Sequence, residues 1–481
     1  MKKANIINRV VFLFLFSACS NWLDVDLVNK VEESKLFKSE QGFQEALAGV
    51  YSKMSKAEMY GSRLTFGALE VMAQSYDYIG MYHRYTELCD YEYKVEKAKI
   101  IIDSMWADGY HTIAMVNNIL GWEQKQGDVM KEEVRRQIKG EALALRAFLH
   151  FDLWRLYAPA YQQDPQARKL PYNRVFGVDL PALCSSKEFL DDCLTDLKDA
   201  LSLLEEDPIL KVVPYALEGN SKDEADLYVA RMNYYAVKAL MARIYLTRND
   251  AGDLQRAREL ALEVIGSNKF ALLDYGKSFP ESRDYWDVLF SDEHIFSVRN
   301  PKIKIYAKGN HYVASGPTMN GNLQMYANYL SDMFDGNNND IRGARWIDGV
   351  QVVKYYMSEN NNKHFIPKVP LIKLSEMYLI VAESYLQEDP EKARQWVEDL
   401  RARRFIGEGE DYKLSNFDEE VLLAEMRREY LFEGQMFFIY KRLNHDIIRR
   451  STPKGDVPAS NEVFVLPMPE SEQEAGNRNV N

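Results

Sequence analysis

The chain has 481 residues, of which 46% are hydrophobic, and a formal net charge of −12 at pH 7. Its length and apolar content allow a sizeable core, so we exclude disorder and expect several domains or one extended helical array. Phosphate contacts dominate nucleic-acid affinity, and an acidic chain without a long cluster of lysines and arginines makes few of them. We therefore expect no nucleic-acid partner.

The N-terminus has the pattern of a secretory signal. Three basic residues precede a short apolar run at residues 10–16, and small residues follow at 17–18. We therefore expect a signal peptide over residues 1–18. The apolar run is far shorter than the roughly 20 residues that cross a bilayer, and no later segment is long and apolar enough to do so.

Cys19 follows directly after the expected signal. Cleavage before Cys19 would leave an N-terminal cysteine, the residue that carries lipid in bacterial lipoproteins. The preceding residues depart from the usual Leu-Ser/Ala-Ala/Gly-Cys pattern, because Phe16 stands at its first position and Leu15 one step earlier. An ordinary signal peptide with an incidental cysteine is the alternative. We expect Cys19 to be lipidated, to attach the chain to a membrane, and to begin a linker over residues 19–38.

Apolar residues recur at helical spacing in three pairs of segments, each joined by a short break. The pairs lie at residues 106–122 and 134–157, at 237–244 and 254–265, and at 374–385 and 393–400. Asp389 and Pro390 resemble an N-cap followed by proline at the first helical position. Such antiparallel pairs resemble tetratricopeptide repeats, although their spacing is irregular. We predict a mainly α fold, a tetratricopeptide-like scaffold of helical hairpins with irregular, loop-rich insertions.

Helical periodicity fails in two places, which we interpret as insertions. Residues 60–93 are rich in tyrosine, and residues 268–365 mix asparagine, glycine, aromatic residues and short β-like runs. Loops on a rigid scaffold often carry binding function, and aromatic rings can stack on sugars or on peptide side chains. The alternative is that the tyrosines pack as a half-buried lid over the helices.

Three cysteines remain beside Cys19, namely Cys89, Cys184 and Cys193. Nine helical residues span about 13 Å, so Cys184 and Cys193 could bridge only if the chain between them is not fully helical. We expect all three to be free or structural.

The sequence offers little support for an enzyme. It contains no H-E-x-x-H helix, no G-x-S-x-G nucleophile turn and no G-x-x-x-x-G-K-S/T phosphate loop. A glycosidase-like pair of carboxylates is defined in space rather than in sequence, so that alternative stays open. We expect Glu429 and Glu433 to share a helical face. With Arg427 and Arg428 nearby, we interpret them as a structural ion-pair network rather than an acid–base pair.

Asp332, Asp335 and Asp340 flank the polar run at residues 336–339 and could offer oxygen ligands to Ca²⁺. Their spacing is not that of an EF-hand loop, so we interpret the segment as a polar turn. We expect no metal and no cofactor.

Two segments near the C-terminus resemble the C-terminal signature of the SusD/RagB family. Residues 425–434 read Glu-Met-Arg-Arg-Glu-Tyr-Leu-Phe-Glu-Gly, and residues 467–472 read Pro-Met-Pro-Glu-Ser-Glu. Met436 and Ile439 stand where the family usually has Arg and Asp. Because residues three apart on a helix share a face, we expect an apolar contact there in place of an ion pair.

The resemblance extends over most of the chain. Further matches to family patterns lie, in order, at residues 106–120, 141–153, 340–342 and 366–383. Lys373 replaces an arginine that is usual in the last of these. Asp24 and Asp26 resemble the acidic stretch that directs lipoproteins of Bacteroidota to the cell surface.

Resemblance to this family, which includes starch-binding SusD, implies a non-catalytic, nutrient-binding lipoprotein that is lipid-anchored and exposed on the outer membrane. It would capture oligosaccharides or peptides and deliver them to a SusC-like TonB-dependent transporter. Family ligand contacts come from comparable loops, which implies these ligand-binding residues: Tyr76, Asp77, Tyr78, Tyr82, Tyr85, Trp286, Asn300 and Tyr312. Two alternatives stay open, a surface degradative enzyme (a glycoside hydrolase or peptidase) and a structural helical adaptor without a ligand.

We divide the chain accordingly into five parts. They are the signal peptide at 1–18, the lipidated linker at 19–38, an N-terminal helical part with the tyrosine-rich insertion at 39–267, the loop-rich insertion at 268–365, and the C-terminal helical part with the signature at 366–481.

Overall fold

The computed structural model describes residues 34–76, 78–79, 83–178, 180–217, 222–311, 323–325, 327–355, 367–407, 409–449 and 455–475. Its helices are α3 (Glu40–Met54), α4 (Ala68–Met72), α5 (Thr86–Cys89), α6 (Glu96–Gln126), α7 (Glu132–Tyr157), α8 (Ser186–Leu203), α9 (Lys222–Val229), α10 (Tyr234–Arg248), α11 (Asp253–Gly266), α12 (Tyr275–Ser278), α13 (Ile303–His311), α14 (Ala327–Met333), α15 (Ile341–Trp346), α16 (Leu374–Tyr385), α17 (Pro390–Arg401), α18 (Glu419–Glu429), α19 (Met436–Leu443), α20 (Asn461–Phe464) and α21 (Glu470–Ala475). Its strands are β1 (Tyr78–Ile79), β2 (Arg168–Leu170), β3 (Cys184–Ser185), β4 (His294–Arg299), β5 (Leu323–Gln324), β6 (Ile347–Asp348), β7 (Gln351–Val352) and β8 (Lys368–Lys373).

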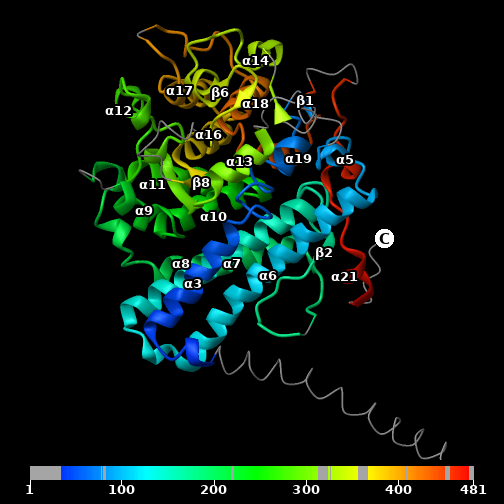
Figure 1. The fold of residues 1–481 in the computed structure, drawn as a ribbon, viewed down its shortest axis with the longest axis vertical. Coiled ribbons are helices and arrows are strands. Elements are labelled where there is room, and N and C mark those ends of the chain that lie inside the picture. The colour runs from blue at the N-terminus through cyan, green and yellow to red at the C-terminus, as the bar shows by residue number, and fades with distance from the viewer. Residues whose placement is uncertain are drawn as a thin grey trace, which may run out of the picture.

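The described part of the chain is mainly helical, which confirms the predicted fold class (Figure 1). The three predicted hairpins are present as the packed pairs α6–α7, α10–α11 and α16–α17. A short 3₁₀ turn at Gly127–Val129 separates α6 from α7, at the break that the sequence indicates. The pairs α10–α11 and α16–α17 also pack on each other through α11 and α16, so the hairpins form one continuous scaffold.

Local residues set the turns of these hairpins. The Asp389 side chain accepts a hydrogen bond from the backbone N of Lys392 at 3.1 Å, and Pro390 begins α17 where no amide donor is needed. This confirms the predicted N-cap. Asn249 ends α10 in the left-handed conformation, with φ of 53°, and Gly252 precedes α11 with φ of 83°. Both residue types tolerate the conformation that the tight α10–α11 turn requires.

A glycine allows close approach of α6 and α7. A Cβ atom added to Gly109 would lie 2.7 Å from Leu153 Cδ2, well inside van der Waals contact. A side chain at this position would force Leu153 to move, so the glycine favours the close packing of the two long helices.

Short antiparallel strand pairs join segments that are distant in sequence. The pair β4–β8 places His294 opposite Lys373 and Arg299 opposite Lys368. All of β8 and all but the last residue of β4 are buried. The pair thus fixes the loop-rich insertion to the start of α16, in the C-terminal helical part.

The C-terminal signature corrects one expectation about helix length. Helix α18 ends at Glu429, and the chain turns through Phe432, with φ of 66°, and Gly434, with φ of 73°. A Cβ atom at Gly434 would lie 2.5 Å from the backbone O of Leu64. Because the helix ends before this turn, Glu429 and Glu433 do not share a helical face, although both contact the same lysine.

The departures from the family signature are accommodated by packing. Met436 begins α19 and is buried, and Ile439 is half-buried against the same core. The expected apolar environment is confirmed at both positions.

The three described cysteines are free thiols, as expected. Cys184 lies in β3 and Cys193 lies inside α8, where its side chain is fully buried.

The C-terminal segment completes the end of α7. The last carbonyl groups of a helix have no partner within the helix. Lys441 Nζ donates to the backbone O of Arg155 at 2.6 Å, and the backbone N of Leu466 donates to the O of Leu156 at 3.0 Å.

Within the described residues, no helix is both long and apolar enough to span a bilayer.

Candidate functional site

The structure brings the two insertions together. Strand β1 pairs antiparallel with β5, so that Tyr78 lies opposite Gln324 (Figure 1). Arg84 Nη2 donates to Asn310 Oδ1 at 2.7 Å. A binding surface built from both predicted insertions is therefore possible at this junction.

Two further hydrogen bonds join the two insertions. The Tyr329 hydroxyl donates to the backbone O of Gln74 at 2.8 Å, and Asn310 Nδ2 donates to Ser62 Oγ at 2.7 Å. These bonds join α14 and α13 to the segment around α4. They hold the base of the junction, whereas the ends of β1 and β5 run into residues outside the described part.

Tyr76 lies beneath this junction and is buried. Its hydroxyl donates to the backbone O of Phe66 at 2.6 Å, and its ring stacks on Phe432 with centroids 5.5 Å apart. Only 3% of the residue is exposed. The expected ligand contact is corrected here: the turn that follows α18 covers the ring, and Tyr76 is a core residue.

Tyr85 is also buried, with 2% exposure. Its ring lies 5.1 Å from the ring of His83, and the guanidinium carbon of Arg84 lies 4.9 Å from the Tyr85 centroid. Burial and, to a lesser extent, the charge of Arg84 together lower the pKa of His83 to about 4. Tyr85 therefore packs at the base of the junction and presents no free face to a ligand in this structure.

Trp286 lies outside the β1–β5 pair. It follows α12, which is at the upper left of Figure 1, whereas β1 is at the upper right. Its indole Nε1 donates to the backbone O of Pro280 at 2.9 Å. The guanidinium carbons of Arg283 and Arg345 lie 5.0 and 4.7 Å from its ring. A half-buried ring beside two guanidinium groups offers little free surface for stacking.

Asn300 is a turn residue. Its side-chain Oδ1 accepts a hydrogen bond from the backbone N of Lys302 at 3.0 Å, and its backbone N donates to the O of Pro367 at 2.7 Å. The residue is 1% exposed, so its side chain cannot reach a ligand from solvent. The expected ligand contact is corrected here as well, because the turn between β4 and α13 needs this side chain.

The remaining predicted residues lie outside the described part of the chain. They are Cys19, Asp77, Tyr82 and Tyr312. For Tyr78 the structure describes the backbone in β1 only.

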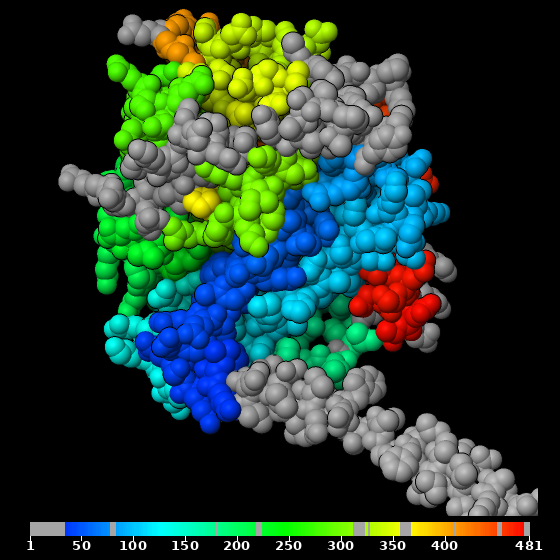
Figure 2. Space-filling view, in the orientation of Figure 1, coloured from blue at the N-terminus to red at the C-terminus, as the bar shows by residue number. Residues whose placement is uncertain are grey.

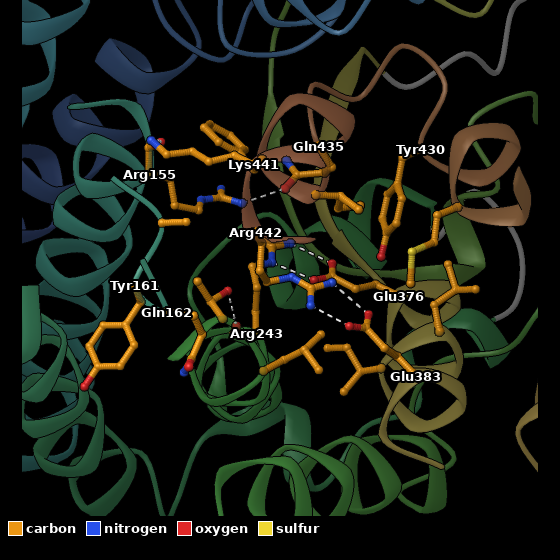
Figure 3. A pocket seen from close by; sticks show the side chains of 18 of the residues that line it. Arg155, Tyr161, Gln162, Arg243, Glu376, Glu383, Tyr430, Gln435, Lys441 and Arg442 are labelled. Carbon is orange, nitrogen blue, oxygen red and sulfur yellow. Dashed lines mark hydrogen bonds and ion pairs between the residues drawn. The ribbon is translucent and has the colours of Figure 1, made fainter. Parts of the chain in front are cut away.

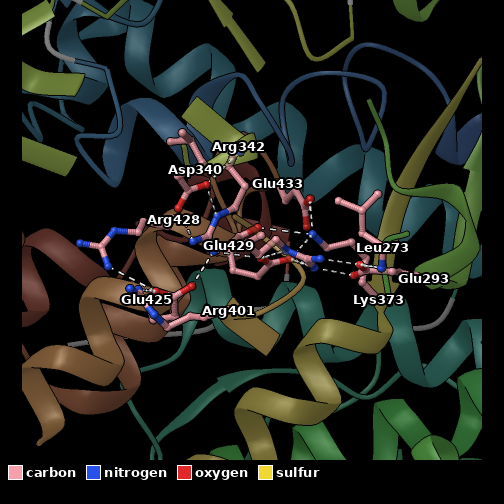
Figure 4. Close-up of polar contacts among 12 residues, drawn as sticks. Leu273, Glu293, Asp340, Arg342, Lys373, Arg401, Glu425, Arg428, Glu429 and Glu433 are labelled. Atoms are coloured by element: carbon pink, nitrogen blue, oxygen red, sulfur yellow. Dashed lines mark hydrogen bonds and ion pairs between the residues drawn. The ribbon is translucent and has the colours of Figure 1, made fainter. Parts of the chain in front are cut away.

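A buried network of charged groups surrounds Glu429 (Figure 4). Glu429 accepts from Arg404 Nε at 2.9 Å, Arg342 Nη1 at 3.1 Å and Lys373 Nζ at 3.0 Å. Burial alone would raise the pKa of this carboxyl, but Arg404 and then Lys373 outweigh it and hold the pKa well below its ordinary value. A carboxylate kept ionised by three cations has no role as a proton donor, which agrees with a structural network.

Glu425 forms the second centre of the network. It accepts from Arg342 Nη1 at 2.6 Å and from Arg401 Nη1 at 2.7 Å, and Arg428 lies 3.3 Å away. Burial raises the pKa of Glu425, but the three guanidinium groups lower it to about 2. Arg428, which we expected beside Glu429 and Glu433, pairs with Glu425 here, and Arg427 donates to the Tyr329 hydroxyl at 3.3 Å.

Glu433 forms the third centre. Lys354 Nζ and Lys373 Nζ lie 2.7 and 2.8 Å from its Oε1. Because Lys373 also contacts Glu429, the turn after α18 brings the two carboxylates to one lysine. The network thereby ties β8 and the end of the loop-rich insertion to the signature.

Two of the three aspartates considered for Ca²⁺, Asp335 and Asp340, are engaged by arginines. Asp340 caps α15 and pairs with Arg342 at 2.7 Å, and Asp335 accepts from Arg428. Among the described residues, no group of three His, Cys, Asp or Glu side chains is placed to hold a metal ion. The polar-turn interpretation accounts for this segment.

A cavity of ≈ 60 Å³ lies between the end of α7, α10, α16 and α19 (Figure 3). Ion pairs form its walls: Arg243 Nε lies 2.6 Å from Glu376 Oε1, and Arg442 Nη2 lies 2.7 Å from Glu383 Oε2. Arg155 donates to Gln435 Oε1 at 3.0 Å. None of the predicted ligand residues lines this cavity, and its volume corresponds to a few water molecules.

Sequence reasoning missed Arg84 and Asn310, which connect the insertions, and Glu293 and Arg404, which extend the buried network. The Arg404 Nη1 to Glu293 Oε1 distance is 2.7 Å, and both residues are fully buried. These residues lie in loops or at element ends, where no periodicity marks burial.

The chain matches two family models. Residues 21–246 match a model described as starch-binding associating with outer membrane, and residues 279–474 match a model described as SusD family. No curated protein sequence matches significantly.

Solved structures with the same fold come from several Bacteroides species. A SusD superfamily protein from Bacteroides thetaiotaomicron is 20% identical, with a TM-score of 0.68 over 91% of this chain and 98% of that chain. A SusD superfamily protein from Bacteroides fragilis is 18% identical, with a TM-score of 0.69 over 91% and 97%. A SusD-like carbohydrate binding protein from Bacteroides vulgatus is 17% identical, with a TM-score of 0.67 over 92% and 97%. At these identities the likeness establishes the fold.

Proposed function

Since the chain belongs to the SusD/RagB family, we propose that it is a non-catalytic binding lipoprotein on the surface of the outer membrane. In this proposal it captures an oligosaccharide or a peptide and passes it to a SusC-like TonB-dependent transporter. Lipidated Cys19 holds it at the membrane. The description of the N-terminal family model, starch-binding associating with outer membrane, supports both the ligand class and the location.

The observation that carries the ligand site is the junction of the two insertions at β1 and β5. Tyr76 and Tyr85 form a buried base beneath it. Above this base we place the ligand contacts of Tyr78, with Asp77, Tyr82 and Tyr312 from the adjoining segments.

A screen of the purified protein against glycan and peptide libraries tests the function. Binding to one class with unchanged ligand after incubation supports a capture protein. Release of shortened products identifies a degradative enzyme, and binding to neither class favours a structural adaptor.

The ligand site is tested with the ligand that the screen identifies. Tyr78→Ala should weaken binding about tenfold or more, as truncation of an aromatic anchor does, with an unchanged melting temperature. Tyr285→Ala is the matched control, because Tyr285 is a surface tyrosine, 48% exposed, that precedes Trp286 in the sequence and lies outside the β1–β5 pair. Equal affinity of the two variants would reject the junction as the site.

Co-purification tests the transporter partnership. Solubilised membranes should retain the transporter on the tagged lipoprotein, and loss of the transporter gene should abolish uptake of the identified ligand. A protein recovered alone from membranes that contain the transporter would contradict this part of the proposal.

A further inference from the structure

The loop between β2 and β3 carries a concentrated group of exposed apolar side chains. Val175 is 72% exposed, Phe176 48%, Val178 98% and Leu180 50%. No other stretch of ten described residues holds more than two large apolar side chains that are exposed. Single exposed apolar residues are common on protein surfaces, but a contiguous group marks an interaction site.

Hydrogen bonds from the scaffold hold the first half of this loop. The backbone N of Asn173 donates to His150 Nε2 at 2.9 Å, and its backbone O accepts from Asn117 Nδ2 at 2.9 Å. Arg146 Nη1 donates to the backbone O of Arg174 at 3.2 Å. Helices α6 and α7 therefore fix the stem on which the apolar tip stands.

Ion pairs with α8 hold the same stem from the other side. Arg174 lies 2.9 Å from Asp192 and 3.1 Å from Asp196. The Tyr172 hydroxyl donates to Asp196 at 2.6 Å. A flexible apolar loop would collapse onto the protein surface, whereas this stem keeps the tip in solvent.

The tip lies at the same end of the molecule as the start of the described chain. In the views of Figures 1 and 2, the teal loop between β2 and β3 and the dark blue segment that begins at Ser34 are both at the lower end. Ser34 lies fifteen positions after Cys19 in the chain. An extended chain of that length spans at most about 50 Å. A lipid on Cys19 would therefore keep this end of the molecule near the bilayer.

We propose that the tip of this loop, formed by Val175, Phe176, Val178 and Leu180, inserts into the outer leaflet beside the lipid anchor. The inference rests on the proposed function for the anchor at Cys19. Membrane binding strengthens with each further signal beside the first acyl chain, and buried apolar surface adds to the binding that acyl chains supply. An acidic chain lacks a basic patch, and the tip supplies apolar surface that lipid can cover without directional contacts.

Tryptophan quenching in the acylated full chain tests the insertion. The protein is reconstituted on vesicles of phosphatidylethanolamine and phosphatidylglycerol that contain brominated lipid. Val178→Trp should be quenched. Leu227→Trp, at a position that is 65% exposed on α9, should be quenched no more than the wild type. The triple change Val175→Ser, Phe176→Ser and Val178→Ser should speed release from the vesicles at least tenfold, because each buried apolar side chain favours binding by roughly that factor.

The outcomes separate this inference from the proposed anchor. Absent quenching of Val178→Trp in acylated protein overturns the insertion and leaves the anchor intact. Quenching of Val178→Trp that appears only when the transporter is present in the same brominated vesicles would assign the tip to a protein partner. Shielding of the tip from solvent by the transporter without lipid would do the same. Either result overturns the proposed insertion. If mass spectrometry finds no acyl group on Cys19, the anchor fails. In that case quenching of Val178→Trp in vesicle-bound protein still supports insertion, and its absence rejects it.

Discussion

Glu70 Oε1 accepts a hydrogen bond from the backbone N of Gly434 at 2.6 Å, which joins α4 to the turn after α18. The two residues are 364 positions apart in the chain. Through this bond the C-terminal signature supports the base of the junction where the two insertions meet. Substitutions of Glu70 and of Gly434 should therefore each change the free energy of unfolding.

Burial raises the pKa of Glu70 to about 7, from an ordinary value of 4.5. Between these values the folded protein holds a proton that the unfolded chain has lost, so the free energy of unfolding falls as pH rises through this window. The loss amounts to about 3 kcal/mol. Glu70→Gln keeps an acceptor for Gly434 and should lack this loss. Chemical denaturation at about pH 4 and about pH 8 measures the difference, with exposed Glu58→Gln as control. Parallel pH dependences for the wild type and Glu70→Gln would contradict the shifted pKa.

Gly434→Ala should destabilise the fold by more than about 2 kcal/mol. The added Cβ would meet the backbone O of Leu64 at 2.5 Å, and the residue has φ of 73°. Gly349→Ala is the matched control, since Gly349 has φ of 61° but nothing within 4 Å of an added Cβ. The control should lose only the conformational cost, about 1–2 kcal/mol. Equal losses in the two variants, measured by urea denaturation, would show that the close approach to Leu64 is relieved at no cost.

Glu429→Gln should lower the free energy of unfolding by about 3–5 kcal/mol, because it leaves buried cations without their carboxylate. Ligand affinity of the folded protein should stay unchanged, since we place the ligand at the β1–β5 junction and not at this network. Glu420→Gln on the exposed side of α18 should change stability by less than about 0.5 kcal/mol. Lost turnover of a substrate at unchanged stability would instead favour the enzyme alternative.

Cys19→Ala should move the protein from the membrane fraction to the soluble fraction, because no other strong anchor would remain. Fractionation and metabolic lipid labelling measure the change. Wild-type protein without incorporated lipid, together with unchanged membrane association of the variant, would reject Cys19 as the anchor.

The hairpin scaffold could be predicted because each of its helices repeats apolar residues along one face. The turn at Asp389 and Pro390 carried its own cap signal, and it formed as expected. The end of α18 was not predictable in the same way. Apolar residues continue beyond Glu429, and the helix stops because Gly434 must pass close to Leu64, a contact between opposite ends of the chain.

In the candidate site, too, the sequence predicted the local segment but not the contacts with distant residues. Tyrosine content identified the segment, but ring type does not distinguish a packing surface from a binding surface. Tyr76 is buried because Phe432 of the C-terminal signature stacks on it, and Arg84, next to the buried Tyr85, is bonded to Asn310 of the second insertion. Only tertiary structure contains that information, since the covering residues lie more than 200 positions away.

Because the C-terminal segment supplies hydrogen-bond donors to the end of α7, the folding of α7 can be completed only after that segment is present. The carbonyl groups of Arg155 and Leu156 receive their partners from Lys441 and Leu466. A chain made from its N-terminus forms α7 long before those partners exist. The first half of the molecule therefore stays incomplete until the last segment is made. Truncation before residue 441 should consequently weaken the whole scaffold rather than remove one local element.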